Sequence, residues 1–156
     1  MKVELINDQD KVELNLNLIK KIARYISGKF DKDPKSQLNL IFTNTEKIRE
    51  LNKKYRSVDR ETDVLSFSYI SDKERISPET GSCTVTIGEI FICPDVAQSN
   101  ISGQSKNWNL NLEIILLIIH GILHIYNYDH VEEKDRVNME SIQNSLISDI
   151  RSTFGL

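Results

Sequence analysis

The chain has 156 residues, of which 39% are hydrophobic and 28% charged, as is ordinary for one globular domain. Its net charge of −3 does not indicate a broadly basic nucleic-acid-binding surface, although a local basic patch would be compatible with it. Charged residues interrupt any N-terminal signal segment, the run 114–119 is too short to span a bilayer, and two cysteines cannot form a disulfide framework. We therefore expect a single domain over residues 1–156 and a cytoplasmic location.

The N-terminal part of the sequence predicts a strand, a helix and a second strand. Residues 3–6 alternate loosely between apolar and polar side chains, which favours a short strand. Apolar residues recur at helical spacing over residues 14–26, and Gly28 is a plausible stop for this helix. A second strand is expected over residues 38–42.

The next elements are predicted from capping and strand patterns. Thr43 stands three residues before Glu46, a capping-box pattern that opens a second helix. Strands are expected over residues 63–69 and 85–93, separated by a polar loop that contains Pro78. Three helices should follow, near Pro94, over residues 109–126 and over residues 132–151.

These elements predict an α+β fold with a small mixed four-stranded sheet packed against about five helices. Two successive strand–helix–strand units favour parallel pairing, whereas the third and fourth strands, adjacent in the chain, can pair antiparallel. A metal site is expected on the helix that carries histidines.

All three histidines of the chain fall within residues 120–130. His120 and His124 are four residues apart in an apolar helix, so their imidazoles lie on one face. If the helix continued, His130 would be rotated by about 240° and displaced by about 9 Å, too far to share a ligand with them. For the three to converge, the helix must end near Tyr126 and the chain turn back, and Asn127 tolerates the left-handed conformation that this requires.

The cluster indicates a metal site more strongly than it indicates structural histidines. The alternative is two core histidines and one surface histidine, but two neutral imidazoles buried side by side would leave polar nitrogens to satisfy. Three nitrogens with an open fourth position are typical of catalytic zinc, which lowers the pKa of water to about 7. We expect one Zn²⁺ bound by His120, His124 and His130.

The spacing also matches the H-E-x-x-H pattern of zinc proteases, in which a glutamate directly after the first histidine is the general base. This chain has Gly121 at that position. A zinc peptidase is therefore the less favoured interpretation.

Several sequence blocks together resemble the YbeY family of bacterial metallo-endoribonucleases. Its H-G-x-L-H-x-x-G-Y-D-H, L-N-x-x-[YF]-R, T-D-V-L-S-F and G-[DE]-I motifs match HGILH with YDH at 120–130, LNKKYR at 51–56, TDVLSF at 62–67 and GEI at 88–90. Met139 and Gln143 fit the usual C-terminal helix. The departures are Asn127 for glycine, Ser68 for proline and Glu89 for aspartate; none replaces a metal ligand.

The resemblance implies a zinc-dependent endoribonuclease specific for single-stranded RNA. It further implies a role in 3′-end maturation of small-subunit (16S) rRNA and in ribosome quality control, with the ribosome or ribosomal proteins as partners. A non-catalytic, zinc-stabilised ribosome-assembly factor remains the alternative, because a pattern of ligands alone does not distinguish a structural metal from a catalytic one.

A basic segment supports a polyanionic substrate. Residues 44–60 have a local excess of three positive charges, which a solvated helix face would also explain. Lys53, Lys54 and Arg56 are the predicted RNA-binding residues. Arg56 is also the predicted catalytic residue, because it matches the arginine of the family motif and a guanidinium binds phosphate bidentately.

Three further residues are candidates for supporting roles. Asp129 is either a carboxylate that orients a metal ligand or the N-cap of the last helix, with Glu132 three residues on. Asp63 and Ser66 are expected either to line the cleft or to have structural roles at the strand end.

Overall fold

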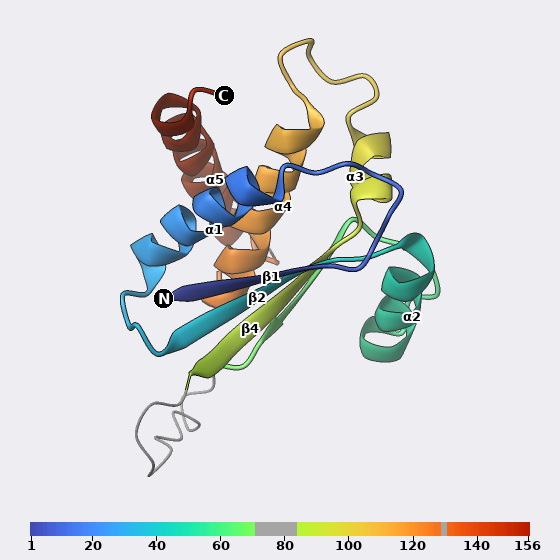
Figure 1. Cartoon of the computed structure of the whole chain (residues 1–156), viewed down its shortest axis with the longest axis horizontal. Helices are drawn as coiled ribbons and strands as arrows, with labels where there is room; N and C mark the ends of the chain where they lie inside the picture. Colours follow the sequence, from blue (N-terminus) through green and yellow to red (C-terminus); the bar gives the residue numbers. More distant parts are fainter. Residues whose placement is uncertain (71–83, 129–130) are drawn as a thin grey trace.

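The computed structural model describes residues 1–70, 84–128 and 131–156. These residues form four strands and five helices in the order that the sequence predicts (Figure 1). In chain order they are β1 (Lys2–Asn7), α1 (Leu16–Phe30), β2 (Ser36–Phe42), α2 (Thr45–Arg56), β3 (Val64–Ser68), β4 (Val85–Ile92), α3 (Pro94–Asn100), α4 (Leu110–Ile125) and α5 (Glu133–Phe154).

The strands form one mixed sheet in the order β1-β2-β4-β3. β1 pairs parallel with β2, and β2 pairs parallel with β4, as strand–helix–strand connections require. β3 pairs antiparallel with β4 and lies at the edge of the sheet. The prediction of a mixed four-stranded α+β fold is confirmed.

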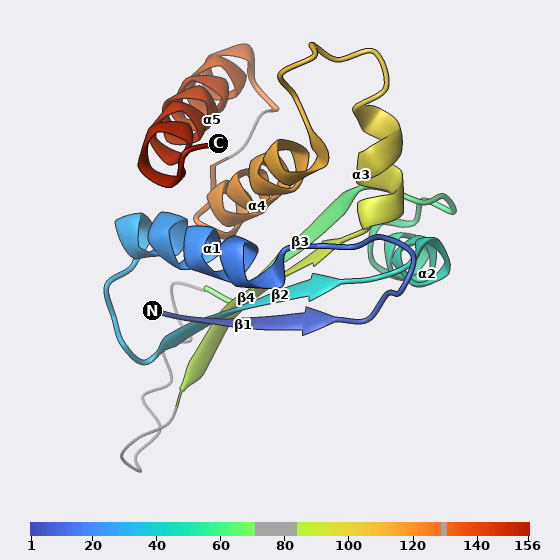
Figure 2. The same cartoon turned by 45° about the horizontal axis from the view of Figure 1, so that its top comes forward.

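The two faces of the sheet are covered differently. Helices α1, α4 and α5 lie over one face, and their apolar side chains form the main core with the strands (Figure 2). α2 lies on the opposite side, where Ile48 packs with Leu65 and Cys93 in a smaller cluster (Figure 1). The strand β3 therefore has α4 on one side and α2 on the other.

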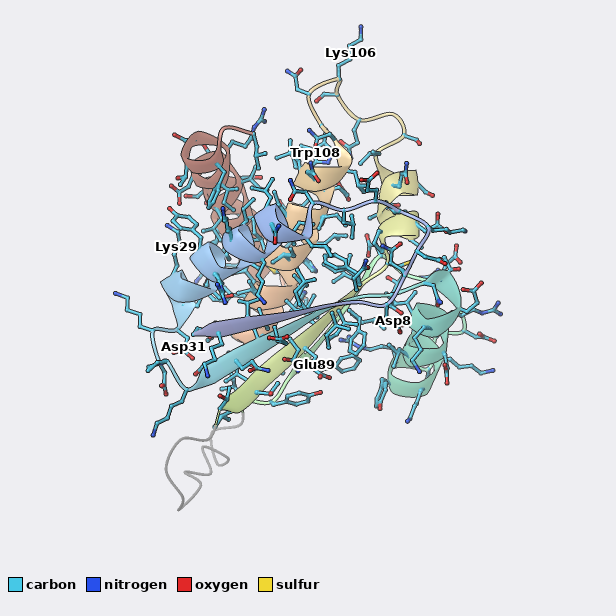
Figure 3. All side chains as sticks on the ribbon, viewed as in Figure 1. Asp8, Lys29, Asp31, Glu89, Lys106 and Trp108 are labelled. Carbon is cyan, nitrogen blue, oxygen red and sulfur yellow. The ribbon has the colours of Figure 1, made fainter. Side chains whose placement is uncertain are left out.

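Beside α2, the second face of the sheet carries a polar network that joins β2, β4 and the residue after β3. Glu89 projects from β4 on the side turned away from α4 (Figure 3). Its carboxylate accepts hydrogen bonds from Asn39 Nδ2 at 3.2 Å and from Tyr69 Oη at 2.8 Å. Burial and the hydrogen bond to Glu89 raise the pKa of Tyr69 to about 12. The glutamate thus ties β2, β4 and the end of β3 together.

Two glycines let α4 lie close to the sheet. A Cβ at Gly121 would be 2.9 Å from Ile90 Cδ1 and from Ile90 Cγ2, and Ile90 is fully buried. A Cβ at Gly88 would be 2.7 Å from Ile125 Cδ1 and 2.8 Å from the Phe67 carbonyl oxygen. Such separations leave no room for a side chain at either position, so α4 sits directly on β4 and β3.

Two helix boundaries differ from the predicted ones. The N-cap of α2 is Asn44, whose side chain accepts a hydrogen bond from the Lys47 amide at 2.8 Å; the predicted cap, Thr43, is wrong. The amide of Thr43 still donates to the Ile92 carbonyl at 2.9 Å, so Thr43 continues the pairing with β4. Gly28 does not end α1, which continues to Phe30.

The predicted end of α4 is confirmed. The helix stops at Ile125, its C-cap is Tyr126, and Asn127 has the left-handed φ of 64°. The amide of Tyr128 then donates to the Leu123 carbonyl at 3.0 Å, which closes the last turn. The chain therefore leaves the helix axis where convergence of the histidines requires it.

The last helix begins too late for Asp129 to be its N-cap, one of the two roles expected for that residue. The N-cap of α5 is Glu132, so Asp129 is not the N-cap. Asp129 and His130 themselves lie outside the described residues, as does the predicted loop around Pro78. Across the described ranges, no helix is both long and apolar enough to cross a membrane.

Replacement of Gly121 by alanine should destabilise the fold by about 1–3 kcal/mol, because the new methyl group overpacks the contact with Ile90. Chemical denaturation measures the free energy of unfolding. Gly28→Ala is the matched control: a Cβ at this position would have nothing within 4 Å, so the substitution should stabilise α1 by about 0.5–1 kcal/mol. Equal stabilities for Gly121→Ala and wild type would contradict the close packing.

Candidate functional site

His120 and His124 face each other at the C-terminal end of α4. Their Nε2 atoms are 3.0 Å apart, and their ring centroids are 4.5 Å apart with the planes inclined by 74°. Two nitrogens at about 2.0–2.1 Å from one zinc ion and at a tetrahedral angle would lie about 3.3 Å apart. The two rings thus have nearly the separation of ligands that share a metal. Within the described ranges, no group of three or more histidine, cysteine or acidic side chains forms a site.

A glutamine of α5 orients the first histidine. Nδ1 of His120 lies 2.9 Å from Oε1 of Gln143. Because an amide oxygen only accepts, this contact requires the proton on Nδ1 and leaves Nε2 as the basic nitrogen of the ring. Nε2 is also the atom directed toward His124, so the tautomer suits metal binding.

A cavity of about 1140 Å³ opens beside the histidines, between the end of α4, β3 and the segment after α2. Pockets for one small molecule are usually about 300–1,000 Å³, so this cavity has room for a segment of a polymer. Of the described residues that line it, two are arginines and none is acidic. They are Asn52, Arg56, Val58, Arg60, Thr62, Val64, Leu65, Ser66, Ser68, His120, His124, Asn127, Tyr128 and Val131.

Arg56 reaches the cavity from the last position of α2. The next residue, Ser57, has a left-handed φ of 57° and turns the chain out of the helix. Nη2 of Arg56 donates to the Ser66 carbonyl at 3.3 Å, so the guanidinium crosses to β3. Arg56 and Ser66 therefore line the same cavity as His120 and His124.

The end of α4 is fastened to β3 by Ser68. Its hydroxyl donates to the Ile125 carbonyl at 2.9 Å and so satisfies a carbonyl of the last helical turn. A proline at this position could not make that bond. The hydroxyl contact and the close packing at Gly88 hold the histidine-bearing end of α4 against β3.

The other predicted site residues lie outside the cavity wall. Lys53 Nζ is 3.5 Å from Asp59, and Lys54 Nζ lies 5.1 Å from the centroid of the Tyr55 ring. The Asp63 carboxylate accepts a hydrogen bond from Asn100 of α3 at 3.0 Å. These contacts do not test the predicted RNA binding by Lys53 and Lys54, which stays a prediction.

Comparison with known proteins identifies the family. A family model described as Endoribonuclease YbeY matches residues 4–151. The chain belongs to the YbeY family. A relative from Dehalococcoides mccartyi, named Endoribonuclease YbeY, is 33% identical over 144 residues, which cover 88% of this chain and 89% of the relative. Another with that name, from Desulforamulus reducens, is 31% identical over 150 residues, which cover 94% and 95% of the two chains.

A solved structure agrees with the fold. The solution structure of TM1509 from Thermotoga maritima aligns with a TM-score of 0.64 at 27% identity and covers 97% of this chain and 91% of that one. The α+β architecture that carries the YbeY motifs is therefore shared with an experimentally determined structure.

The YbeY motifs do not contain every residue that shapes this cavity. Arg60 lies outside these motifs, and Asn52 lies in the LNKKYR motif without a role that the sequence indicates. Gln143 was expected in the last helix, but the sequence does not show its partner. The contact between Gln143 and His120 joins two helices, and no local spacing could have indicated it. The sequence indicated Arg60 only as one of the positive charges of the basic segment.

Gln143→Leu should weaken metal binding by about 10–100-fold, since it removes the acceptor that fixes the His120 tautomer. Competition with a chromophoric chelator measures the affinity, and nitrogen chemical shifts of the imidazole report the tautomer without metal. Asn144→Leu, at an exposed position next to it, is the control. An unchanged tautomer population and affinity in Gln143→Leu would show that the glutamine does not orient the ring.

Proposed function

We propose that this chain is a zinc-dependent endoribonuclease that cleaves single-stranded RNA. The observation that carries the proposal is the convergence of two imidazole Nε2 atoms, 3.0 Å apart, on a cavity that also contains Arg56. Relatives over most of the chain are named Endoribonuclease YbeY, which supports the same reaction. One metallo-endoribonuclease domain would extend over residues 1–156.

His120 and His124 fit a zinc ion in chemistry and in separation, with Gln143 holding the protonated Nδ1 away from it. We propose His130 as the third ligand. Support comes from the left-handed turn at Asn127 and from Tyr128 and Val131, which line the cavity on both sides of the segment that contains His130. When bound, zinc would supply Lewis acidity and an activated water for phosphodiester hydrolysis.

Arg56 is proposed to stabilise the charge that grows on the scissile phosphate. Its guanidinium lines the cavity and is anchored to β3 through the Ser66 carbonyl, which limits its movement. A donor that is already oriented needs no reorganisation when charge develops, and this is the usual basis of electrostatic catalysis. Ser66 would thus position Arg56 through its backbone. Asp63 is bonded to Asn100, so it would support the strand end.

The cavity wall suits unpaired nucleotides. Two arginines can bind phosphates, while Val58, Tyr128 and Val131 offer apolar surface for the bases. Bases in a duplex are stacked and paired, whereas those of a single strand can turn into such a cavity. This supports single-stranded RNA as the substrate.

The proposed biological role is 3′-end maturation of 16S rRNA and ribosome quality control in the cytoplasm. Ribosomal RNA would be the substrate, and the ribosome or its proteins the partners. Asp129, adjacent to His130 in sequence, is proposed to orient that ligand.

A zinc peptidase is not supported, because position 121 faces Ile90 and has no space for the glutamate that such enzymes need. A non-catalytic assembly factor is separated from the enzyme by the kinetic experiment on Arg56.

Arg56→Ala should lower the cleavage rate constant by about 10²–10³-fold while the zinc content stays the same. Arg56→Lys should recover only part of the rate, because a point charge does not replace the bidentate guanidinium. Single-turnover cleavage of a defined single-stranded RNA measures the effect. Arg24→Ala, at an exposed arginine of α1, is the control. A wild-type rate in Arg56→Ala would remove Arg56 from the mechanism, and no cleavage by wild type would favour the assembly factor.

His130→Ala should reduce the zinc content well below one ion per chain, since two histidines bind zinc more weakly than three. Elemental analysis of the purified variant measures the content. Removal of metal with a chelator should abolish cleavage by the wild type, and added zinc should restore it. Stoichiometric zinc in His130→Ala would mean that the third ligand is another group.

A further inference from the structure

The structure places five of the six cations of the basic segment in two groups, and the sixth, Lys54, lies over the ring of Tyr55. Three cations of α2 form ion pairs: Lys47 with Glu50 of the same helix at 3.3 Å, and Arg49 and Lys53 with Asp59 of the segment after α2 at 2.9 and 3.5 Å. The hydrogen bond from Arg49 is the main cause that lowers the pKa of the Asp59 carboxyl, so this acid is ionised at neutral pH. Of the described residues that line the cavity, only Arg56 and Arg60 are cationic.

The segment that carries Arg60 is held in place from both sides. On the inner side, Asn52 Nδ2 donates to the Arg60 carbonyl at 2.9 Å, and the Val58 amide donates to the Asn52 carbonyl at 3.3 Å. Asn52 is only 6% exposed, so its amide is shielded from competing water. On the outer side, Asp59 is tied to Arg49. The backbone at residue 60 is therefore fixed, although the Arg60 side chain is exposed.

We propose that Arg60 binds a phosphate of the RNA other than the scissile one, and that Asn52 positions it. The inference rests on the proposed endoribonuclease function and adds an RNA contact that no motif residue supplies. Arg56 and Arg60 are four residues apart and line the same cavity as His120 and His124, so a strand bound there can contact both arginines. A volume of about 1140 Å³ accommodates more than one small ligand and hence a flanking nucleotide.

The two arginines should have different kinetic effects. A contact with a flanking phosphate is the same in the ground state and in the transition state, so it lowers the RNA concentration needed for half-saturation and leaves the maximal rate unchanged. Each phosphate contact on a single strand also contributes about 0.7 to the slope of log affinity against log salt concentration.

Binding and single-turnover cleavage of one defined single-stranded RNA test the inference over a range of salt concentrations. Arg60→Ala should weaken binding about tenfold, reduce the salt slope by about 0.7, and change the maximal cleavage rate by less than about threefold. Arg60→Lys should retain the slope. Arg24→Ala should match the wild type in all three quantities.

The role of Asn52 is tested in a double-mutant cycle. Asn52→Ala should weaken RNA binding in the wild-type background and have little further effect when combined with Arg60→Ala. Additive losses of RNA affinity would mean that Asn52 does not act through Arg60. If Asn52→Ala does not fold, the same cycle is measured with Asn52→Asp, which also removes the donor to the Arg60 carbonyl.

The outcomes separate this inference from the proposed function. If the wild type binds and cleaves the RNA but Arg60→Ala keeps its affinity and salt slope, the inference about Arg60 is wrong and the enzyme stands. If the wild type binds without cleaving, the catalytic proposal fails, and Arg60 is judged from binding alone. A wild type that does not bind single-stranded RNA would overturn both.

Discussion

The contact between Gly121 of α4 and Ile90 of β4 determines where the whole site lies. Because no side chain fits between helix and sheet at this point, α4 rests directly on the strands. Gly88 repeats the arrangement one helical turn further along, under Ile125. His120 and His124 project from the same end of α4. Their distance from β3 therefore depends on the close approach of helix and sheet that Gly121 and Gly88 allow. This packing fixes the position of the end of α4, which forms one wall of the cavity.

The same contact explains why this histidine pair, although spaced as in zinc proteases, lacks the glutamate base of those enzymes. The residue after the first histidine is directed into the core, so a general base cannot come from that position. The cationic groups that line the cavity come from the end of α2 and from the segment after it, and among the described lining residues they are the guanidinium groups of Arg56 and Arg60. A cavity that offers positive charge opposite a potential metal ion suits a phosphodiester better than a peptide.

Most of the fold could be predicted because the apolar periods are strong. The end of α4 followed from a geometric requirement, since only a left-handed residue near position 127 lets the histidines converge. Thr43 and Asn44 are both capping residue types and adjacent in the sequence, and only the hydrogen bond from the Lys47 amide to the Asn44 side chain decides between them. The charge count of α2 could not show that Asp59 neutralises Arg49, and the contact of Gln143 with His120 joins distant positions.

Arg56 also contacts the edge strand of the sheet. β3 is the last strand of the sheet, and among the described residues no strand pairs with its outer side. The hydrogen bond from Arg56 to the Ser66 carbonyl occupies an acceptor that an edge strand would otherwise present to a second polypeptide. A bulky cation over such an edge opposes strand addition. We therefore expect the residue proposed for catalysis also to disfavour self-association of the folded chain through β3.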